Sequence, residues 1–256
     1  MQLSIIEQIL IRSGPTNDGL AIWCLPGFAD SGAAFSALHQ TEFAKSAQVI
    51  TPDLPGFGSS PINNHACTID TYVATLLKLI DNLTPDANIG FIGHSVGSII
   101  AVEAALHLGD RCQGVFSIEG NLTKNDAYFS GQAVNFDTPQ EFKKLFTDKI
   151  WIKGESNKIF RAYFSSLKQA DATAMWRFGQ DVNQYSKGDL PGKKVMKLNC
   201  PFLYFWCSDN TPIASQKFLD SNKINNTQIT GTSHWPMIDA SELTAKHLLN
   251  FFEKQK

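Results

Sequence analysis

The chain reads Asn88-Ile89-Gly90-Phe91-Ile92-Gly93-His94-Ser95-Val96-Gly97 at its most informative point. The apolar run before Gly93 is typical of a strand buried on both faces. The segment from residue 98 to 106 is rich in helix formers and is followed by Gly109, which suits a helix C-cap. A strand and a helix joined by Gly-x-Ser-x-Gly make a turn so sharp that the serine backbone is strained and the flanking positions must be small. The pattern predicts that Ser95 is a nucleophile.

Length and composition exclude several classes of protein. A chain of 256 residues fits one α/β domain with an insertion better than two equal domains. A formal net charge of −2, without a basic cluster, argues against nucleic acid as a partner. The apolar runs are too short to span a membrane, and the N-terminus does not resemble a signal peptide.

Cysteine and histidine spacing points to a site without a metal. The five cysteines contain no Cys-x-x-Cys pair, and the six histidines contain no pair at metal-binding spacing. Dispersed cysteines in odd number favour reduced thiols in a cytoplasmic protein. We therefore expect a cytoplasmic protein with neither metal nor cofactor.

Strand and helix patterns alternate along most of the chain. Strands are expected at 3–11, 20–25, 49–51, 88–92, 114–118, 201–207 and 227–230, and helices at 69–83, 98–106 and 241–252. This alternation predicts an α/β fold with a mostly parallel sheet and helices on both faces. Residues 121–195 show only helical patterns, so we expect a core of 1–120 and 196–256 with a helical cap inserted over the carboxyl edge of the sheet. The alternative is that 121–195 is further scaffold.

A serine nucleophile needs a base, and the chain offers two histidines late enough to supply it. In proteins with this turn the order along the chain is Ser, acid, His. Only His234 and His247 lie well beyond the helix that follows Ser95. His247 falls within a helical pattern, whereas His234 lies in a loop that leaves the last strand. We expect His234 to be the general base.

The acid that orients the histidine has two main candidates. Asp209 follows the strongly apolar strand 201–207 and precedes a turn, and it is the preferred one. Glu119 ends the strand at 114–118 and reaches the same edge of the sheet, so it is the alternative acid. Asp126 is a weaker third candidate.

Backbone amides are expected to stabilise the oxyanion. One donor is the N–H that follows the nucleophile, on Val96, at the positive end of a helix. The second is the N–H of Phe28, in the loop after the strand at 20–25. A plain Pro-Gly turn is the other interpretation of that loop.

Together these features resemble the α/β-hydrolase superfamily, within its capped serine hydrolases. Four stretches match the landmarks of that family in order: Leu25-Pro26-Gly27-Phe28, 53–60, 93–97, and Asp209 with His234. The common His-Gly of the oxyanion loop is replaced by Pro26-Gly27, which leaves the backbone donor available. Members that carry aspartate at the elbow form alkyl-enzyme esters, and Ser95 argues against that chemistry.

The resemblance implies hydrolysis of a carboxylic ester or thioester, a small-molecule substrate, through an acyl-enzyme. Aromatic residues are frequent in 121–195, and some are expected to roof a pocket for small to medium apolar acyl groups, although rings at helical spacing are more often core. Two alternatives stay open. One is a C–C bond hydrolase or lyase with the same three residues, and the other is a ligand receptor of low turnover.

Overall fold

A single eight-stranded sheet organises the chain. The computed structural model describes residues 1–16, 19–62 and 67–253. The strands are β1 (Gln2–Ile6), β2 (Ile9–Ser13), β3 (Leu20–Leu25), β4 (Gln48–Pro52), β5 (Asn88–His94), β6 (Cys112–Ile118), β7 (Phe202–Cys207) and β8 (Asn226–Ile229). Their order across the sheet is β1-β2-β4-β3-β5-β6-β7-β8. The strands from β4 to β8 are parallel, while β1 and β2 form an antiparallel hairpin at the edge.

That hairpin corrects one expected strand. The sequence predicted a single strand over 3–11, but the chain turns back at Glu7 and Gln8, which both have positive φ angles of 49° and 68°. The turn places Ile9 and Ile11 in the core, while Leu3 and Ile5 on β1 stay exposed. The partial alternation in this segment therefore belongs to two short strands.

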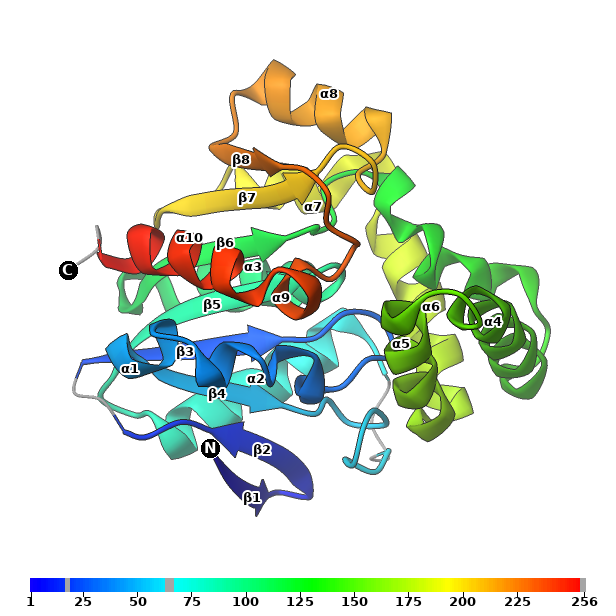
Figure 1. Ribbon diagram of the computed structural model, residues 1–256, viewed down its shortest axis with the longest axis horizontal. Coiled ribbons are helices and arrows are strands. Elements are labelled where there is room, and N and C mark those ends of the chain that lie inside the picture. Colours follow the sequence, from blue (N-terminus) through cyan, green and yellow to red (C-terminus); the bar gives the residue numbers. More distant parts are fainter. Residues whose placement is uncertain (17–18, 63–66, 254–256) are drawn as a thin grey trace.

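Helices cover both faces of the sheet, as predicted (Figure 1). The described α-helices outside residues 121–195 are α1 (Phe43–Ser46), α2 (Ile69–Leu83), α3 (Gly97–Leu108), α8 (Ile213–Asn222), α9 (Pro236–Asp239) and α10 (Ser241–Glu253). Helices α1 and α10 lie on one face, and α2 and α3 on the other. Helix α2 begins at a capping box in which Thr68 and Thr71 bond each other's backbone amides.

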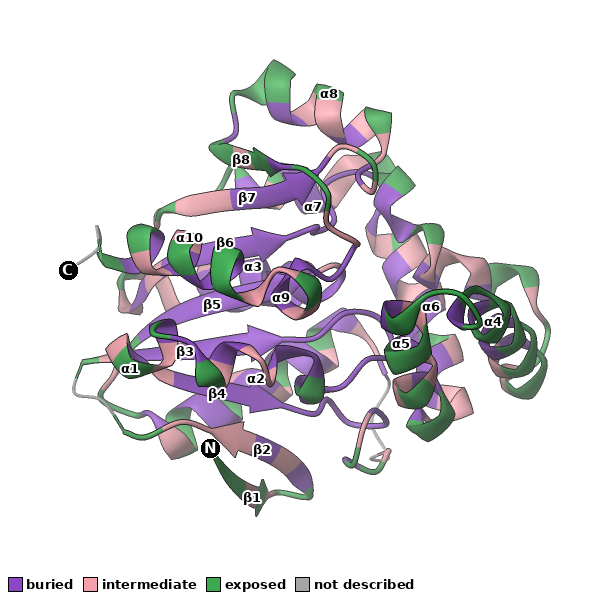
Figure 2. Cartoon of the chain, in the orientation of Figure 1, coloured by how far each residue is buried: buried purple, intermediate pink, exposed green. Residues whose placement is uncertain are grey.

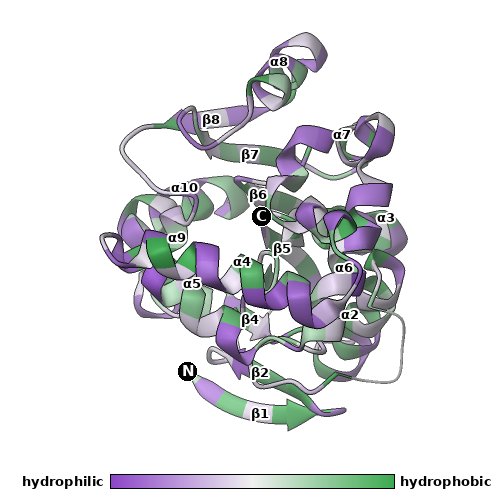
Figure 3. Cartoon of the chain, turned by 90° about the vertical axis from the view of Figure 1, so that its right-hand side faces the viewer, coloured by the Kyte–Doolittle hydropathy of each residue, from purple (hydrophilic) through white to green (hydrophobic). Residues whose placement is uncertain are grey.

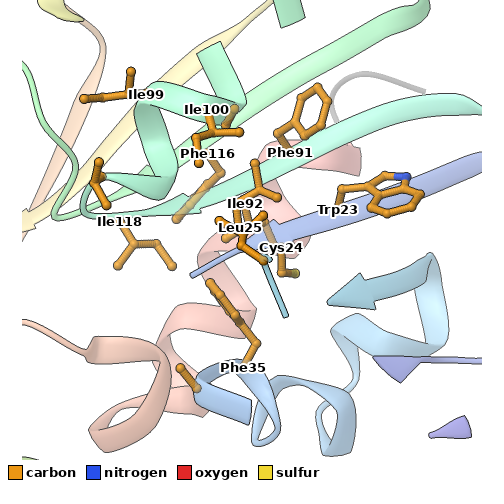
Figure 4. Packing of buried hydrophobic residues seen from close by; sticks show 14 of the residues in the cluster. Trp23, Cys24, Leu25, Phe35, Phe91, Ile92, Ile99, Ile100, Phe116 and Ile118 are labelled. Carbon is orange, nitrogen blue, oxygen red and sulfur yellow. The ribbon is translucent and has the colours of Figure 1, made fainter. Parts of the chain in front are cut away.

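The hydrophobic core lies on both faces of the central strands. Figure 4 shows Trp23 and Leu25 of β3, Phe91 of β5 and Phe116 of β6, and all four are inaccessible to solvent. The strand register places Trp23 and Phe91 on one face of the sheet and Phe116 on the other, where it packs against Phe251 of α10. Figure 2 shows that these strands are buried along most of their length. Cys24 lies among them, and burial raises the pKa of its thiol, so it serves as a small apolar side chain. A rigid centre of this kind can hold a strained turn at its edge.

The segment between β6 and β7 is entirely helical. It contains the 3₁₀-helices η4 (Lys124–Tyr128), η5 (Ser130–Asn135) and η6 (Lys187–Asp189), and the α-helices α4 (Pro139–Gly154), α5 (Lys158–Gln169), α6 (Ala172–Tyr185) and α7 (Leu190–Val195). Helices α4 to α6 lie beyond the carboxyl ends of the strands (Figure 1). The division into a core and a cap at 121–195 stays a prediction. Within the described residues, no helix is both long and apolar enough to cross a membrane.

Candidate active site

Ser95 lies on the turn between β5 and α3. Its φ angle is +51°, in the left-handed region that costs a non-glycine residue energy, and its backbone N–H donates to the carbonyl of Ile118 at 3.0 Å. A Cβ at Gly93 would lie 2.4 Å from the Cα of Ser98, and one at Gly97 would lie 2.3 Å from the carbonyl oxygen of Leu25. The turn therefore requires both glycines, for the reason that the sequence pattern indicated.

His234 lies in the loop between β8 and α9 and is buried. It lines one small cavity of about 10 Å³ together with Ser95 and Phe28. The loop is tied to the nucleophile turn, because Nε2–H of His94 donates to the carbonyl oxygen of His234 at 2.8 Å. The structure thus brings the predicted nucleophile and base to the same cavity. Within the described residues, the hydrogen-bond partner of the His234 ring is Tyr128, at 3.1 Å from Nδ1, rather than Ser95.

Glu119 is the acid beside the histidine. Its Oε2 atom lies 3.9 Å from Nδ1 of His234. The residue directly follows β6, has a positive φ angle of 47° and is buried. Its carboxylate accepts hydrogen bonds from the N–H of Cys207 at 2.7 Å and from the hydroxyl of Thr211 at 2.9 Å. These donors hold the carboxylate against the imidazole.

Asp209, the preferred acid from sequence, lies elsewhere. It is exposed, and no interaction among the described residues joins it to His234. The turn after β7 instead directs Asn210 and Thr211 toward Glu119. The carboxylate of Asp126 is also occupied elsewhere, since it accepts hydrogen bonds from the backbone N–H of Thr123 and from the hydroxyl of Ser215. The geometry therefore favours the alternative acid.

Burial sets the charge states at this site. It raises the pKa of Glu119 to about 7, although the hydrogen bonds from Cys207, Thr211 and Asn210 act in the opposite direction. Burial lowers the pKa of His234 well below its usual value, and the neighbouring His94 lowers it further. The imidazole is therefore neutral at physiological pH, which is the form that can accept a proton.

The loop after β3 forms the opposite wall. Phe28 is buried, and its ring packs against those of Phe142, Phe146 and Phe178 with centroids about 6 Å apart, at 6.2, 6.0 and 6.1 Å. Its carbonyl oxygen accepts from the hydroxyl of Tyr163 at 2.8 Å. Neither the N–H of Phe28 nor that of Val96 donates to another described residue. Both candidate oxyanion donors are thus unpaired within the described part of the chain.

Three polar residues at this site were not predicted from sequence. They are His94, Tyr128 and Asp30, and each is adjacent to the catalytic cavity or bonded to His234. His94 could have been found, because it occupies the first variable position of the Gly-x-Ser-x-Gly motif. Tyr128 and Asp30 carry no local signal, since they reach the site only through the fold. Among the aromatic rings of 121–195, Phe142, Phe146, Tyr163 and Phe178 are buried, and Phe129 and Tyr163 are those that line the cavity.

No cluster of three or more His, Cys, Asp or Glu side chains that could hold a metal ion occurs in the described part of the chain.

Comparison with known proteins establishes the family. The chain belongs to the α/β-hydrolase fold family, whose model matches residues 21–241. It is 28% identical over 116 residues to the chloroplastic protein PHYLLO of Arabidopsis thaliana, which covers 42% of this chain and 7% of that protein. It is 29% identical over 154 residues to the mitochondrial palmitoyl-protein thioesterase ABHD10 of Bos taurus, which covers 57% of this chain and 48% of that protein. The chain thus spans less than half the length of these two relatives.

Solved structures share the whole fold. An N-acyl homoserine lactonase, AidH, in complex with N-butanoyl homoserine has a TM-score of 0.78 at 16% identity and covers 100% of this chain and 98% of its own. A thermophilic esterase from Thermogutta terrifontis has a TM-score of 0.76 at 17% identity and covers 100% of this chain and 99% of its own. At these identities the likeness shows the fold alone.

Proposed function

We propose that this protein is a serine hydrolase that cleaves a carboxylic ester or thioester through an acyl-enzyme. The observation that carries the proposal is the strained Ser95, at φ +51°, sharing one small cavity with His234. A backbone held in that conformation by a rigid core exposes the hydroxyl above the sheet edge. The thioesterase among the relatives and the esterase among the similar structures agree with this class of reaction.

Each residue then has a defined step. Ser95 Oγ attacks the carbonyl carbon as His234 removes its proton, and the imidazolium returns that proton to the leaving alcohol or thiol. Water, deprotonated by the same imidazole, attacks the acyl-enzyme; the imidazolium returns that proton to Ser95 Oγ as the bond to the acyl group breaks and the acid leaves. The amides of Phe28 and Val96 donate to the oxyanion in both steps.

Glu119 is the acid in this proposal, in place of Asp209. A carboxylate beside Nδ1 holds the imidazole in the tautomer whose Nε2 can accept the serine proton, and it stabilises the imidazolium. Glu119 is 3.9 Å from Nδ1, and Asp209 is exposed. Tyr128, which occupies Nδ1 at 3.1 Å, must release it for Glu119 to act as the partner.

A fluorophosphonate probe tests the proposal directly. The wild-type protein should gain the mass of one phosphonyl group and lose activity toward p-nitrophenyl esters, because only an activated serine reacts with the probe. The Ser95→Ala variant should gain no mass. Labelling that persists in Ser95→Ala, or no labelling of the wild type, would contradict the proposal.

A further inference from the structure

A groove lies between helix α5 and the part of the core that follows β3. Its volume is about 290 Å³, and it is bounded by α5, by α9 and by the segment around η1 (Gly32–Phe35). Helices α5 and α9 lie side by side in both views (Figures 1 and 3). Most of the lining is aliphatic and comes from Ala34, Ala37, Ile159, Ala162 and Ile238.

The groove ends at the wall of the catalytic cavity. Asp30, Tyr163 and Trp235 line both spaces, so they form a partition between them. The partition is fastened at two points. Nε1–H of Trp235 donates to Asp30 at 3.1 Å, and the hydroxyl of Tyr163 donates to the carbonyl of Phe28 at 2.8 Å. The rings of Tyr163 and Trp235 lie 5.0 Å apart.

The catalytic cavity cannot hold a substrate by itself. Its volume of about 10 Å³ is close to that of a single water molecule. On the side of α4 and α6, the rings around Phe28 fill the space. The groove is the adjoining space that is large enough for an acyl chain. Tyr163, which separates the two spaces, belongs to α5. Rotation of the Tyr163 side chain away from Phe28 would join the two spaces.

On the basis of the proposed function, we infer that this groove is the acyl subsite and that it takes an unbranched apolar acyl chain of medium length. Its methyl and aliphatic walls suit a hydrocarbon chain, because burial of each methylene against them stabilises the complex. The acyl half stays bound to Ser95 through both steps, whereas the alcohol leaves after the first. Contacts between the groove and the substrate can therefore lower the barriers of both steps only if the groove holds the acyl half.

Filling the groove tests this inference. We expect Ala162→Trp and Ala37→Trp to lower kcat/KM for p-nitrophenyl octanoate at least about tenfold, with p-nitrophenyl acetate changed less than about twofold, since only the longer chain needs the space. Ala172→Trp is the matched control, because Ala172 lies on α6 and does not line the groove. It should leave kcat/KM for both the octanoate and the acetate ester unchanged. The ratio of kcat/KM for butyl acetate to that for octyl acetate, which differ only in the alcohol, should be the same in all variants.

Two outcomes would overturn the inference while leaving the proposed function intact. One is an unchanged acyl-length profile in both groove variants that still react with fluorophosphonate. The other is a loss confined to the alcohol series.

A binding measurement makes the test independent of turnover. Calorimetry should detect octanoate binding to Ser95→Ala and its loss in Ser95→Ala combined with Ala162→Trp. Octanoate that binds both equally, or binds neither, would count against the groove whatever the activity of the enzyme.

Discussion

Oε2 of Glu119 lies 3.9 Å from Nδ1 of His234, at the point where β6 and the loop after β8 converge on the same edge of the sheet. Three donors fix the carboxylate: the N–H of Cys207, the hydroxyl of Thr211 and the side-chain amide of Asn210. The acid is thus supported by the turn after β7, although it does not come from that turn.

The first prediction separates the two acids. Glu119→Gln should lower kcat/KM by about 10³-fold or more, because a neutral amide neither selects the productive tautomer nor stabilises the imidazolium. Asp209→Asn should stay within about twofold of wild type, since Asp209 is exposed. Steady-state kinetics on both variants, with circular dichroism to verify folding, checks this. The reverse ranking would restore Asp209 as the acid.

The second prediction concerns pH. Burial raises the pKa of Glu119 to about 7 and lowers that of His234. The active form needs an ionised Glu119 and a neutral His234, so kcat/KM should fall as the pH decreases through about 7, where the carboxylate gains a proton. Measurement of kcat/KM from about pH 5 to about pH 9 would show this decrease on the acidic side. Activity that stays constant down to about pH 5 would mean that Glu119 remains ionised there.

The third prediction concerns Tyr128, which occupies Nδ1 of His234 at 3.1 Å. Tyr128→Phe removes this competing hydroxyl and leaves Glu119 as the partner of Nδ1. We expect kcat to rise roughly two- to tenfold, the range that a net hydrogen bond of about 0.5–1.5 kcal/mol allows. Single-turnover kinetics distinguishes an effect on chemistry from one on product release. A decrease in kcat would assign the hydroxyl a role in holding the imidazole.

The fourth prediction concerns His94, whose Nε2–H fastens the carbonyl of His234. His94→Leu leaves that buried carbonyl unpaired, which should cost about 1–3 kcal/mol and lower kcat more than it changes KM. His94→Gln keeps an N–H donor and should recover part of the loss. Urea unfolding and Michaelis kinetics on both variants measure the two effects. Equal activity of the two variants would show that the hydrogen bond does not position the base.

The fifth prediction concerns the elbow. Gly97→Ala places a Cβ 2.3 Å from the carbonyl oxygen of Leu25 and 2.6 Å from that of Pro26, and both are backbone atoms that cannot move aside as a side chain could. We expect a loss of about 1–3 kcal/mol in the free energy of unfolding together with loss of fluorophosphonate labelling. Gly14→Ala, whose Cβ would lie 3.6 Å from its nearest neighbours, is the control and should be neutral in both assays.

The sequence by itself determined the parts of this protein that depend on local pattern. Apolar strands alternating with helices predict a mostly parallel sheet covered on both faces, and the structure has one. The spacing of Gly93, Ser95 and Gly97 requires a sharp turn, because no side chain fits at either glycine. The late loop position of His234 singled it out among the histidines.

Only the tertiary structure decided which carboxylate faces His234. Glu119 and Asp209 follow neighbouring parallel strands that end at the same edge, so strand order cannot separate them. The choice depends on the positive φ of Glu119 and on the donors from the next turn, which direct one side chain inward while the other stays exposed. The same holds for Tyr128 and for the groove beside α5, since each joins segments that are distant along the chain and adjacent only after folding.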